Sequence, residues 1–186
     1  MGQRHHLASA LCSAILAATM AACLAPPAAA EESGQWHGKG VIVITSTNRV
    51  KVDDSANHTI ATTEWDGAIF NGEGKAFLDK AHYQVAGQVD SAGARGGYKT
   101  FSEGDGSKVF AKFTNTEAKP PEFRGTFVFT GGTGKYEGIT GNGTFHLMMV
   151  SDKAGWDELA GEYKIPTQLM GSSTPPAIGA ADGKSK

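Results

Sequence analysis

The sequence predicts an all-β domain, a single antiparallel β-barrel of about eight strands. Short runs of β-branched and aromatic residues alternate with Gly, Asn and Asp turn residues along the chain. No long segment has the apolar spacing of an amphipathic helix. A small all-β domain must protect the edges of its outer strands, and closure into a barrel removes those edges. A sandwich of two β-sheets is the alternative, because sequence alone does not fix strand order.

Each strand is recognised by its own local pattern. The β-branched run at 41–45 predicts a strand that is either buried on both faces or the first strand of a barrel. Residues 81–89 alternate with a period of two, which places Tyr83 and Val85 on one face. The sequence Gly-Asp-Gly at 104–106 is typical of a hairpin turn. Strands are expected, in chain order, at 41–45, 59–63, 65–71, 81–89, 98–102, 107–115, 123–130, 143–150 and 159–165.

The segment 127–145 is the most informative part of the chain. It joins two apolar strands through a glycine-rich connection that is too short for a crossover helix. Glycine permits positive φ and close backbone approach, so these glycines suit a tight loop. The structural glycines of this loop are expected to be Gly131, Gly132, Gly134 and Gly138.

The motif Thr-Gly-Gly-Thr-Gly-Lys-Tyr-Glu-Gly at 130–138 resembles the glycine-rich hairpin of the allene oxide cyclase barrel-like superfamily. Allene oxide cyclases and dirigent proteins share that barrel, and small secreted bacterial proteins of unassigned activity look similar. The resemblance implies a β-barrel and, as in the plant proteins, assembly into oligomers. No other stretch aligns with the catalytic positions of either plant family, so no catalytic residue is assigned.

The glycine loop differs from a phosphate-binding loop. Lys135 follows Gly134, but Phe129 stands where that motif needs glycine, and Tyr136 stands where it needs Ser or Thr. Lysine and arginine are scattered among acidic residues, which argues against a nucleic-acid surface. We therefore expect no nucleotide cofactor and no nucleic-acid partner.

The N-terminus has the features of an export signal. A basic start precedes an apolar run at 7–24 and a small-residue cleavage site at 28–30. The protein is therefore expected to be secreted or periplasmic, without a membrane span; a lipoprotein anchored through Cys23 is the alternative. Cleavage removes Cys12 and Cys23, so disulfides do not stabilise the mature domain. The chain is divided into a signal peptide, a β-barrel domain and a disordered tail at 1–30, 31–165 and 166–186.

Catalytic chemistry leaves little trace in the sequence. The four histidines that follow the signal lack metal-ligand spacing, so no metal is expected. There is no Gly-x-Ser-x-Gly motif for a nucleophilic serine. Asp157 and Glu158 are adjacent, so in a strand they point to opposite faces, and we interpret them as solvated.

A barrel of this size holds at most one small molecule. Aromatic side chains on its strands either fill the core or line a ligand cavity. A carboxylate beside them would be a functional acid if it faced inward, because an apolar cavity raises its pKa. The candidate ligand-binding residues are Glu64, Trp65, Tyr83, Tyr98 and Phe113.

These observations favour an exported, non-enzymatic barrel that binds a small apolar ligand or serves as a structural module. The alternative is a cyclase or isomerase that holds an apolar substrate in the barrel. An open cavity with converging buried ionisable groups would favour binding or catalysis, whereas a filled interior would favour the structural role. At 144–150 both faces are largely apolar, with Phe145, Leu147 and Met149 on one of them. The outer face therefore needs cover, either from the chain's own termini or from a neighbouring subunit, and we favour the homo-oligomer.

Overall fold

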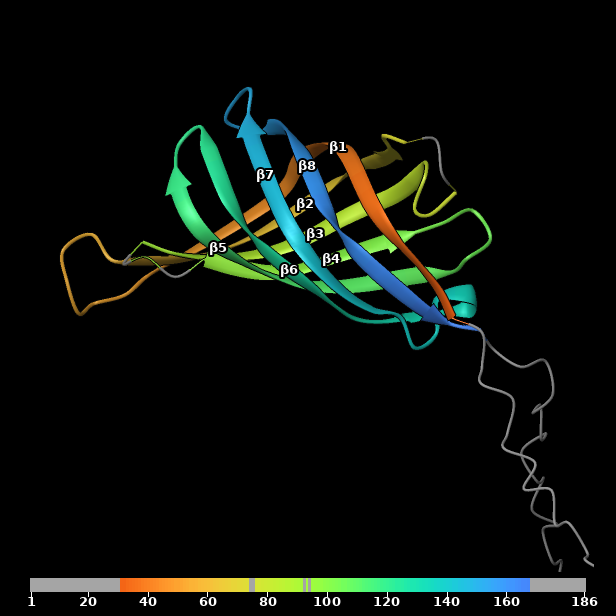
Figure 1. Ribbon diagram of the computed structural model, residues 1–186. Coiled ribbons are helices and arrows are strands. Elements are labelled where there is room, and N and C mark those ends of the chain that lie inside the picture. The colour runs from red at the N-terminus through yellow and green to blue at the C-terminus, as the bar shows by residue number, and fades with distance from the viewer. Residues whose placement is uncertain (1–30, 74–75, 92, 94, 168–186) are drawn as a thin grey trace, which may run out of the picture.

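The computed structural model describes residues 31–167, except 74, 75, 92 and 94. Eight antiparallel strands pair in chain order, and β8 returns to pair with β1, so the sheet closes into a barrel (Figure 1). This confirms the predicted barrel and rules out the two-sheet sandwich. The strands are β1 (Glu31–Lys51), β2 (Thr59–Asn71), β3 (Ala81–Asp90), β4 (Arg95–Ser102), β5 (Lys108–Lys119), β6 (Glu122–Thr133), β7 (Thr140–Met149) and β8 (Ala154–Pro166).

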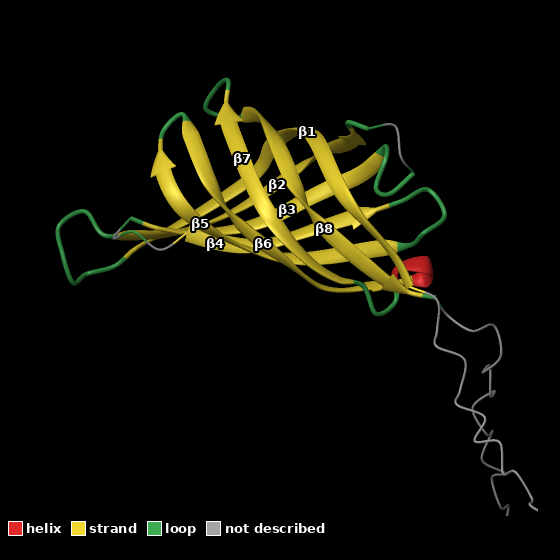
Figure 2. Ribbon diagram, viewed as in Figure 1, coloured by secondary structure: helices red, strands yellow, loops and turns green. Residues whose placement is uncertain are grey.

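Helical structure is nearly absent from the described part of the chain. Figure 2 shows one short helical turn against the strands, the 3₁₀ element η1 at Gly134–Tyr136. Among the described residues, no helix is long and apolar enough to cross a membrane. The expected signal peptide at 1–30 and the tail beyond residue 167 lie outside the described residues, and Pro166 belongs to β8 rather than to the tail.

The first strand is far longer than its apolar run. β1 has 21 residues, and its first part pairs with β8 while its second part pairs with β2. The extension at 31–40 contains three glycines that face large aromatic side chains. A Cβ built on Gly34 would lie 3.0 Å from the Tyr163 hydroxyl, and one built on Gly40 would lie 3.2 Å from Tyr83 Cδ1. These glycines weaken the strand signal in the sequence but give the aromatic rings room.

Of the two alternatives for 41–45, burial on both faces is wrong, and the run belongs instead to the first strand of the barrel. Ile42 is buried, but Val41 is 59% exposed and Val43 is 46% exposed. The strand therefore alternates between the interior and the outer wall, as expected for a barrel strand. The segments 59–63 and 65–71 also form one strand, β2, rather than two.

Aromatic side chains fill one end of the barrel. Trp36 contacts Phe77, Phe101 and Phe127 edge to face, with ring centroids 5.6–6.2 Å apart. The ring of Phe77 stacks on Tyr163 at 3.9 Å. This plug occupies the end at which β1 begins and β8 ends, since Glu31 pairs with Pro166. We call this the filled end.

The glycine loop closes the filled end. Gly134 has φ of 62°, in the left-handed region that favours glycine, and Gly131 and Gly138 have φ of 147° and 77°. Gly132 is needed for a different reason, because an added Cβ would lie 2.5 Å from the Tyr136 carbonyl oxygen. The loop thereby turns Tyr136 inward, where it is buried and its hydroxyl donates a hydrogen bond to Glu103.

Candidate functional site

The other end of the barrel contains a cavity. Its volume is about 210 Å³, and its walls come from the parts of the strands next to the β1–β2, β3–β4, β5–β6 and β7–β8 connections. In Figure 1 these connections lie at the end opposite the two termini of the barrel. The lining is mainly apolar and includes the aromatic side chains Trp65, Phe113, Phe123 and Phe145. The barrel is therefore filled at one end and open at the other.

Two charged side chains meet across the interior of the barrel. Lys99 extends from β4 and Asp157 from β8, and three strands separate β4 from β8 in either direction around the barrel. Lys99 Nζ donates a hydrogen bond to Asp157 Oδ2 at 2.5 Å. Both side chains are almost completely buried, with 3% and 1% exposed. Both also line the cavity, so this ion pair forms its inner boundary.

Tyr83 on β3 completes the group. Its hydroxyl donates to Asp157 Oδ2 at 2.7 Å and accepts a hydrogen bond from Lys99 Nζ. The ring stacks on Phe101 with centroids 5.0 Å apart, which fixes its position against the filled end. We call Lys99, Asp157 and Tyr83 the buried triad.

The environment of the triad keeps Tyr83 protonated. Burial, reinforced by the negative charge and the hydrogen bond of Asp157, raises the pKa of the Tyr83 phenol well above its ordinary value. The hydroxyl therefore keeps its proton near neutral pH and acts as a hydrogen-bond donor. Its proton points at the carboxylate that also receives the Lys99 ammonium.

The carboxylate of Asp157 is only half satisfied. Oδ2 accepts from both Lys99 and Tyr83, whereas Oδ1 is buried and has no hydrogen-bond partner among the described residues. Leaving a buried carboxylate oxygen without a donor is costly, and such groups are rare in folded proteins. Because Asp157 lines the cavity, a bound molecule with an N–H or O–H group would supply the donor.

Aromatic rings surround the Lys99 ammonium. Its Nζ lies 4.6 Å from the centroid of Phe145, 5.2 Å from Phe113 and 5.1 Å from Tyr83. Cation–π attraction of this kind partly compensates for the hydration that the ammonium loses on burial. The rings also shield the amine, so the cavity is its route to other molecules.

The structure places the predicted ligand residues in different surroundings. Trp65 and Phe113 line the cavity, whereas Tyr83 does not line it and instead donates a hydrogen bond to Asp157, which does. Glu64 is exposed on the outer wall, and Tyr98 is 56% exposed there. The expectation that these two face a cavity is wrong. Glu64 precedes the inward-facing Trp65, Tyr98 precedes the inward-facing Lys99, and successive side chains in a strand point to opposite faces. Contact of Trp65, Tyr83 and Phe113 with a ligand stays a prediction.

Sequence reasoning missed Lys99 and Asp157. Asp157 and Glu158 do point to opposite faces, but Asp157 points inward and Glu158 pairs with Lys39 at 2.8 Å on the outside. The signal in the sequence that could have identified them is the alternation of inward and outward side chains along each strand. Asp157 lies two residues before the inward Leu159, and Lys99 lies two residues before the inward Phe101.

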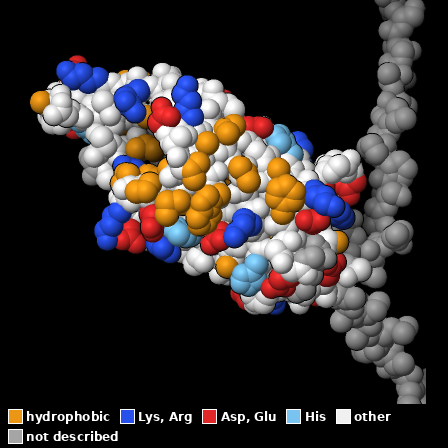
Figure 3. Space-filling model, turned by 90° about the horizontal axis from the view of Figure 1, so that it is seen from above, with side chains coloured by type: hydrophobic (Ala, Val, Ile, Leu, Met, Phe, Trp, Pro, Cys, Tyr) orange, Lys and Arg blue, Asp and Glu red, His pale blue; other side chains and the backbone are white. Residues whose placement is uncertain are grey.

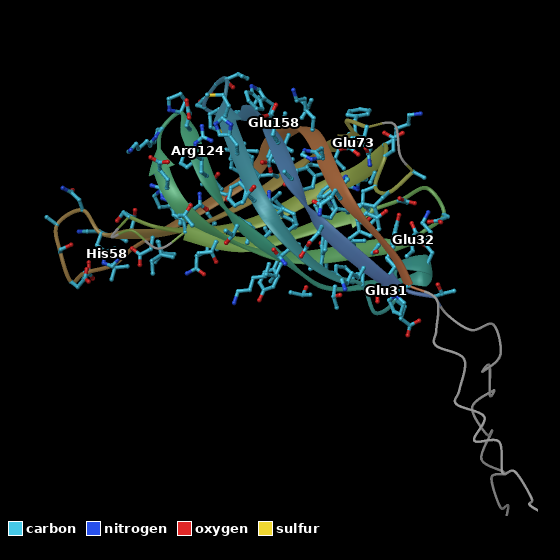
Figure 4. All side chains as sticks on the ribbon, in the orientation of Figure 1. Glu31, Glu32, His58, Glu73, Arg124 and Glu158 are labelled. Carbon is cyan, nitrogen blue, oxygen red and sulfur yellow. The ribbon has the colours of Figure 1, made fainter. Side chains whose placement is uncertain are left out.

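A larger hollow of about 640 Å³ lies on the outer wall over β6, β7, β8 and β1. Figure 4 shows two of its charged side chains, Arg124 and Glu158, on the upper strands. Arg124 pairs with Glu122 at 3.1 Å, and Glu158 pairs with Lys39. Because these charges neutralise each other in solvent, the interior cavity is the stronger candidate site.

His58 lies at the open end, far from Glu31 and Glu32 (Figure 4). Its Nδ1 is 2.6 Å from Asp54 Oδ1 and its Nε2 is 2.8 Å from Asp90 Oδ1, so it links the β1–β2 connection to the end of β3. The hydrogen bond with Asp54, followed by that with Asp90, raises the pKa of His58 above its usual value of 6.5. Two charged acceptors favour the doubly protonated ring, which donates from both nitrogens.

We expect the His58 imidazole to titrate with a midpoint above pH 6.5, measured from its Cε1 proton by NMR. Because the pKa is raised in the folded state, the stabilisation is fully present below about pH 6.5 and is lost as pH rises through the folded pKa. The Val52 amide, which donates to the His58 carbonyl at 2.9 Å, should exchange faster above that midpoint after correction for intrinsic rates. Asp54→Asn should lower the midpoint; an unchanged midpoint in this variant would contradict the assignment.

No protein-family model matches the chain, and no curated protein matches its sequence. Among solved structures, the chain is similar to the pterocarpan synthase dirigent protein GePTS1, with 14% identity and a TM-score of 0.48, over 76% of this chain and 90% of that one. It is also similar to the pterocarpan synthase dirigent protein PsPTS1, with 12% identity and a TM-score of 0.47, over 74% of this chain and 97% of that one. At this level of similarity, the functional argument rests on the cavity itself.

Proposed function

We propose that this barrel binds a small, mostly apolar molecule in its open end, with an N–H or O–H group of the molecule directed at Asp157. The observation that carries the proposal is the free Oδ1 oxygen of Asp157, buried at the inner end of an aromatic cavity. A purely structural barrel has no need for an apolar cavity bounded by a half-satisfied carboxylate. Binding would complete the hydrogen bonding of that carboxylate and fill the cavity.

The size of the cavity limits the ligand. At about 210 Å³ it is smaller than sites for drug-sized molecules, which span roughly 300–1,000 Å³. A molecule with one or two rings fits such a space. The aromatic lining favours a flat, apolar body.

Indole, benzothiophene and a cavity-filling variant test the proposal. Indole has an N–H donor, and benzothiophene has the same shape without one. We expect indole to bind about tenfold more tightly by calorimetry, because a donor to a buried charged acceptor contributes about 1.4 kcal/mol or more. Leu147→Trp, on the inner face of β7, should abolish binding of both compounds.

Met148→Trp is the matched control, because Met148 is the next residue and faces the outer wall. It should bind both compounds as the unaltered protein does. Equal affinity for indole and benzothiophene would contradict the proposed hydrogen bond to Asp157. Unchanged binding of both compounds by Leu147→Trp would show that they do not bind in the cavity.

Catalysis is the second candidate function. Asp157 lines the cavity and has a free acceptor oxygen, while Tyr83, which does not line the cavity, donates a hydrogen bond to the other oxygen of the same carboxylate. A carboxylate positioned in this way could accept and return a proton in a cyclase or isomerase reaction on an apolar substrate. Mass spectrometry of a molecule extracted from the purified protein, before and after incubation in D₂O, tests it; deuterium uptake that needs the protein supports catalysis, and its absence supports binding alone.

Export is part of the proposal. The basic and apolar segments within residues 1–30 and the small residues at 28–30 support cleavage before Glu31 and a secreted or periplasmic location. An intact mass corresponding to residues 31–186 would support this cleavage, whereas a lipid on Cys23 would contradict it.

The outer wall supports self-association. An apolar row crosses four neighbouring strands on the outer wall. Met148 of β7 pairs with Trp156 of β8, Trp156 pairs with Val41 of β1, and Val41 pairs with Ala68 of β2. Figure 3 shows hydrophobic side chains gathered between charged ones on the face seen from above. We expect residues 31–167 to form a homo-oligomer in light scattering, and Val41→Glu to shift it toward a monomer. A monomer in the unaltered protein would contradict this expectation.

A further inference from the structure

We propose that Lys99 captures aldehydes or ketones in the cavity by forming an imine with their carbonyl carbon. The inference rests on the proposed binding function and names a ligand class for it: small, apolar carbonyl compounds. It adds a reversible covalent step to the non-covalent site described above.

Lys99 is set apart from every other lysine in the described part of the chain. It is 3% exposed and lines an apolar cavity. The other described lysines lie on the outer wall or in connections; those in ion pairs, for example, are 50–81% exposed. Apolar, water-poor pockets are where lysine amines act as nucleophiles toward carbonyl groups. An arginine would supply the same charge but not this reactivity.

Asp157, the neighbour of Lys99, can accept the proton that the ammonium must lose before it reacts. Asp157 Oδ2 lies 2.5 Å from Nζ, so the ammonium proton can pass directly to the carboxylate. This transfer turns a buried ion pair into a neutral amine and a neutral acid without changing the net charge of the cavity. The Tyr83 hydroxyl, 2.7 Å from the same oxygen, continues to donate a hydrogen bond to it.

The steps balance without a further reagent. The Nζ lone pair attacks the carbonyl carbon, the C–N bond forms, and the electron pair of the C=O π bond moves to oxygen. One proton then passes from the attacking nitrogen to that oxygen, which gives a neutral carbinolamine and leaves Asp157 protonated. Asp157 returns a proton to the carbinolamine hydroxyl, the C–O bond breaks, and water leaves. The overall change is Lys–NH₃⁺ plus O=CR₂ to Lys–NH⁺=CR₂ plus H₂O, with the positive charge retained beside Asp157.

The free Asp157 oxygen also fits this sequence. The carbinolamine carries a new hydroxyl group near Nζ, and Oδ1 has no other donor among the described residues. The product iminium stays against the aromatic rings that already face Nζ at 4.6–5.2 Å. The site thus has a partner for the nucleophile, the intermediate and the product.

Reductive trapping tests the inference. The protein is incubated with benzaldehyde and sodium cyanoborohydride, which delivers hydride to the iminium carbon and makes the bond permanent. Peptide mapping by mass spectrometry then compares Lys99 with Lys112, an exposed lysine on the adjacent strand β5. We expect Lys99 to be modified at least about tenfold faster than Lys112 at low aldehyde concentration.

Leu147→Trp and Lys99→Arg are the control variants. Leu147→Trp should suppress modification of Lys99 and leave that of Lys112 unchanged, whereas Lys99→Arg should remove the fast-reacting site. Modification of Lys99 no faster than that of Lys112 would overturn the imine proposal in the unaltered protein, whether or not any variant folds. Indole binding measured on the same sample separates the two claims. If indole binds but Lys99 forms no adduct, the binding function stands and the imine proposal fails. If indole does not bind and no adduct forms, both claims fail.

Discussion

Replacement of Lys99 by methionine is expected to lower the free energy of unfolding by about 3–5 kcal/mol, because it leaves the Asp157 carboxylate buried without its counter-ion. Methionine fills nearly the same space as the lysine stem, so the effect comes mainly from charge rather than from a cavity. Asp157 is 1% exposed, and Tyr83 alone would remain to donate to it. Urea unfolding followed by tryptophan fluorescence measures the change.

The double variant Lys99→Met, Asp157→Leu separates charge pairing from packing. Removing both charges should restore the free energy of unfolding to within about 1–2 kcal/mol of the unaltered protein or raise it, since a buried ion pair contributes little net stability. Lys39→Met breaks the exposed pair with Glu158 and should cost at most about 1 kcal/mol. A double variant as unstable as Lys99→Met would show that the pair is not electrostatically coupled as the structure implies.

Replacement of Trp36 by alanine should have an effect of similar size, about 3–5 kcal/mol, because it removes the centre of the filled end. The indole is 1% exposed and contacts four aromatic rings, those of Phe77, Phe101, Phe127 and Phe129. These rings come from different parts of the barrel, so collapse around the lost side chain is limited. Thermal unfolding by circular dichroism, together with urea unfolding, measures the loss.

Trp156→Ala is the matched control, because it removes the same side chain from the outer wall. It should cost clearly less than Trp36→Ala in a monomeric preparation. Equal effects of the two replacements would mean that the filled end is not the main source of stability.

Strand parity was the part of the fold most readily predicted from sequence. The alternation at 81–89 placed Tyr83 and Val85 on the same face, and both are buried in the structure. The face of β7 that carries Phe145 and Leu147 also lines the cavity, as one of the two apolar faces expected for that strand. Such inferences succeed because side chains of a strand alternate between two sides whatever the strand order.

The extent of β1 and the buried triad were beyond sequence reasoning for different reasons. Residues 31–40 lack a strong strand signal because their glycines serve partners on other strands, such as Tyr163 and Tyr83. Lys99 and Asp157 are 58 residues apart, and only closure of the barrel brings β4 opposite β8. Parity marks each of them as inward, but it does not say that they meet.

The pairing of Glu31 with Pro166 has a practical meaning for how the molecule is presented to its surroundings. Both ends of the barrel domain leave it at the filled end, and the cavity opens at the other. A surface, a fusion partner or an affinity tag joined at either end is therefore attached at the pole away from the entrance. In a sensor or capture material that holds this domain by either end of its chain, the cavity entrance would face the solution.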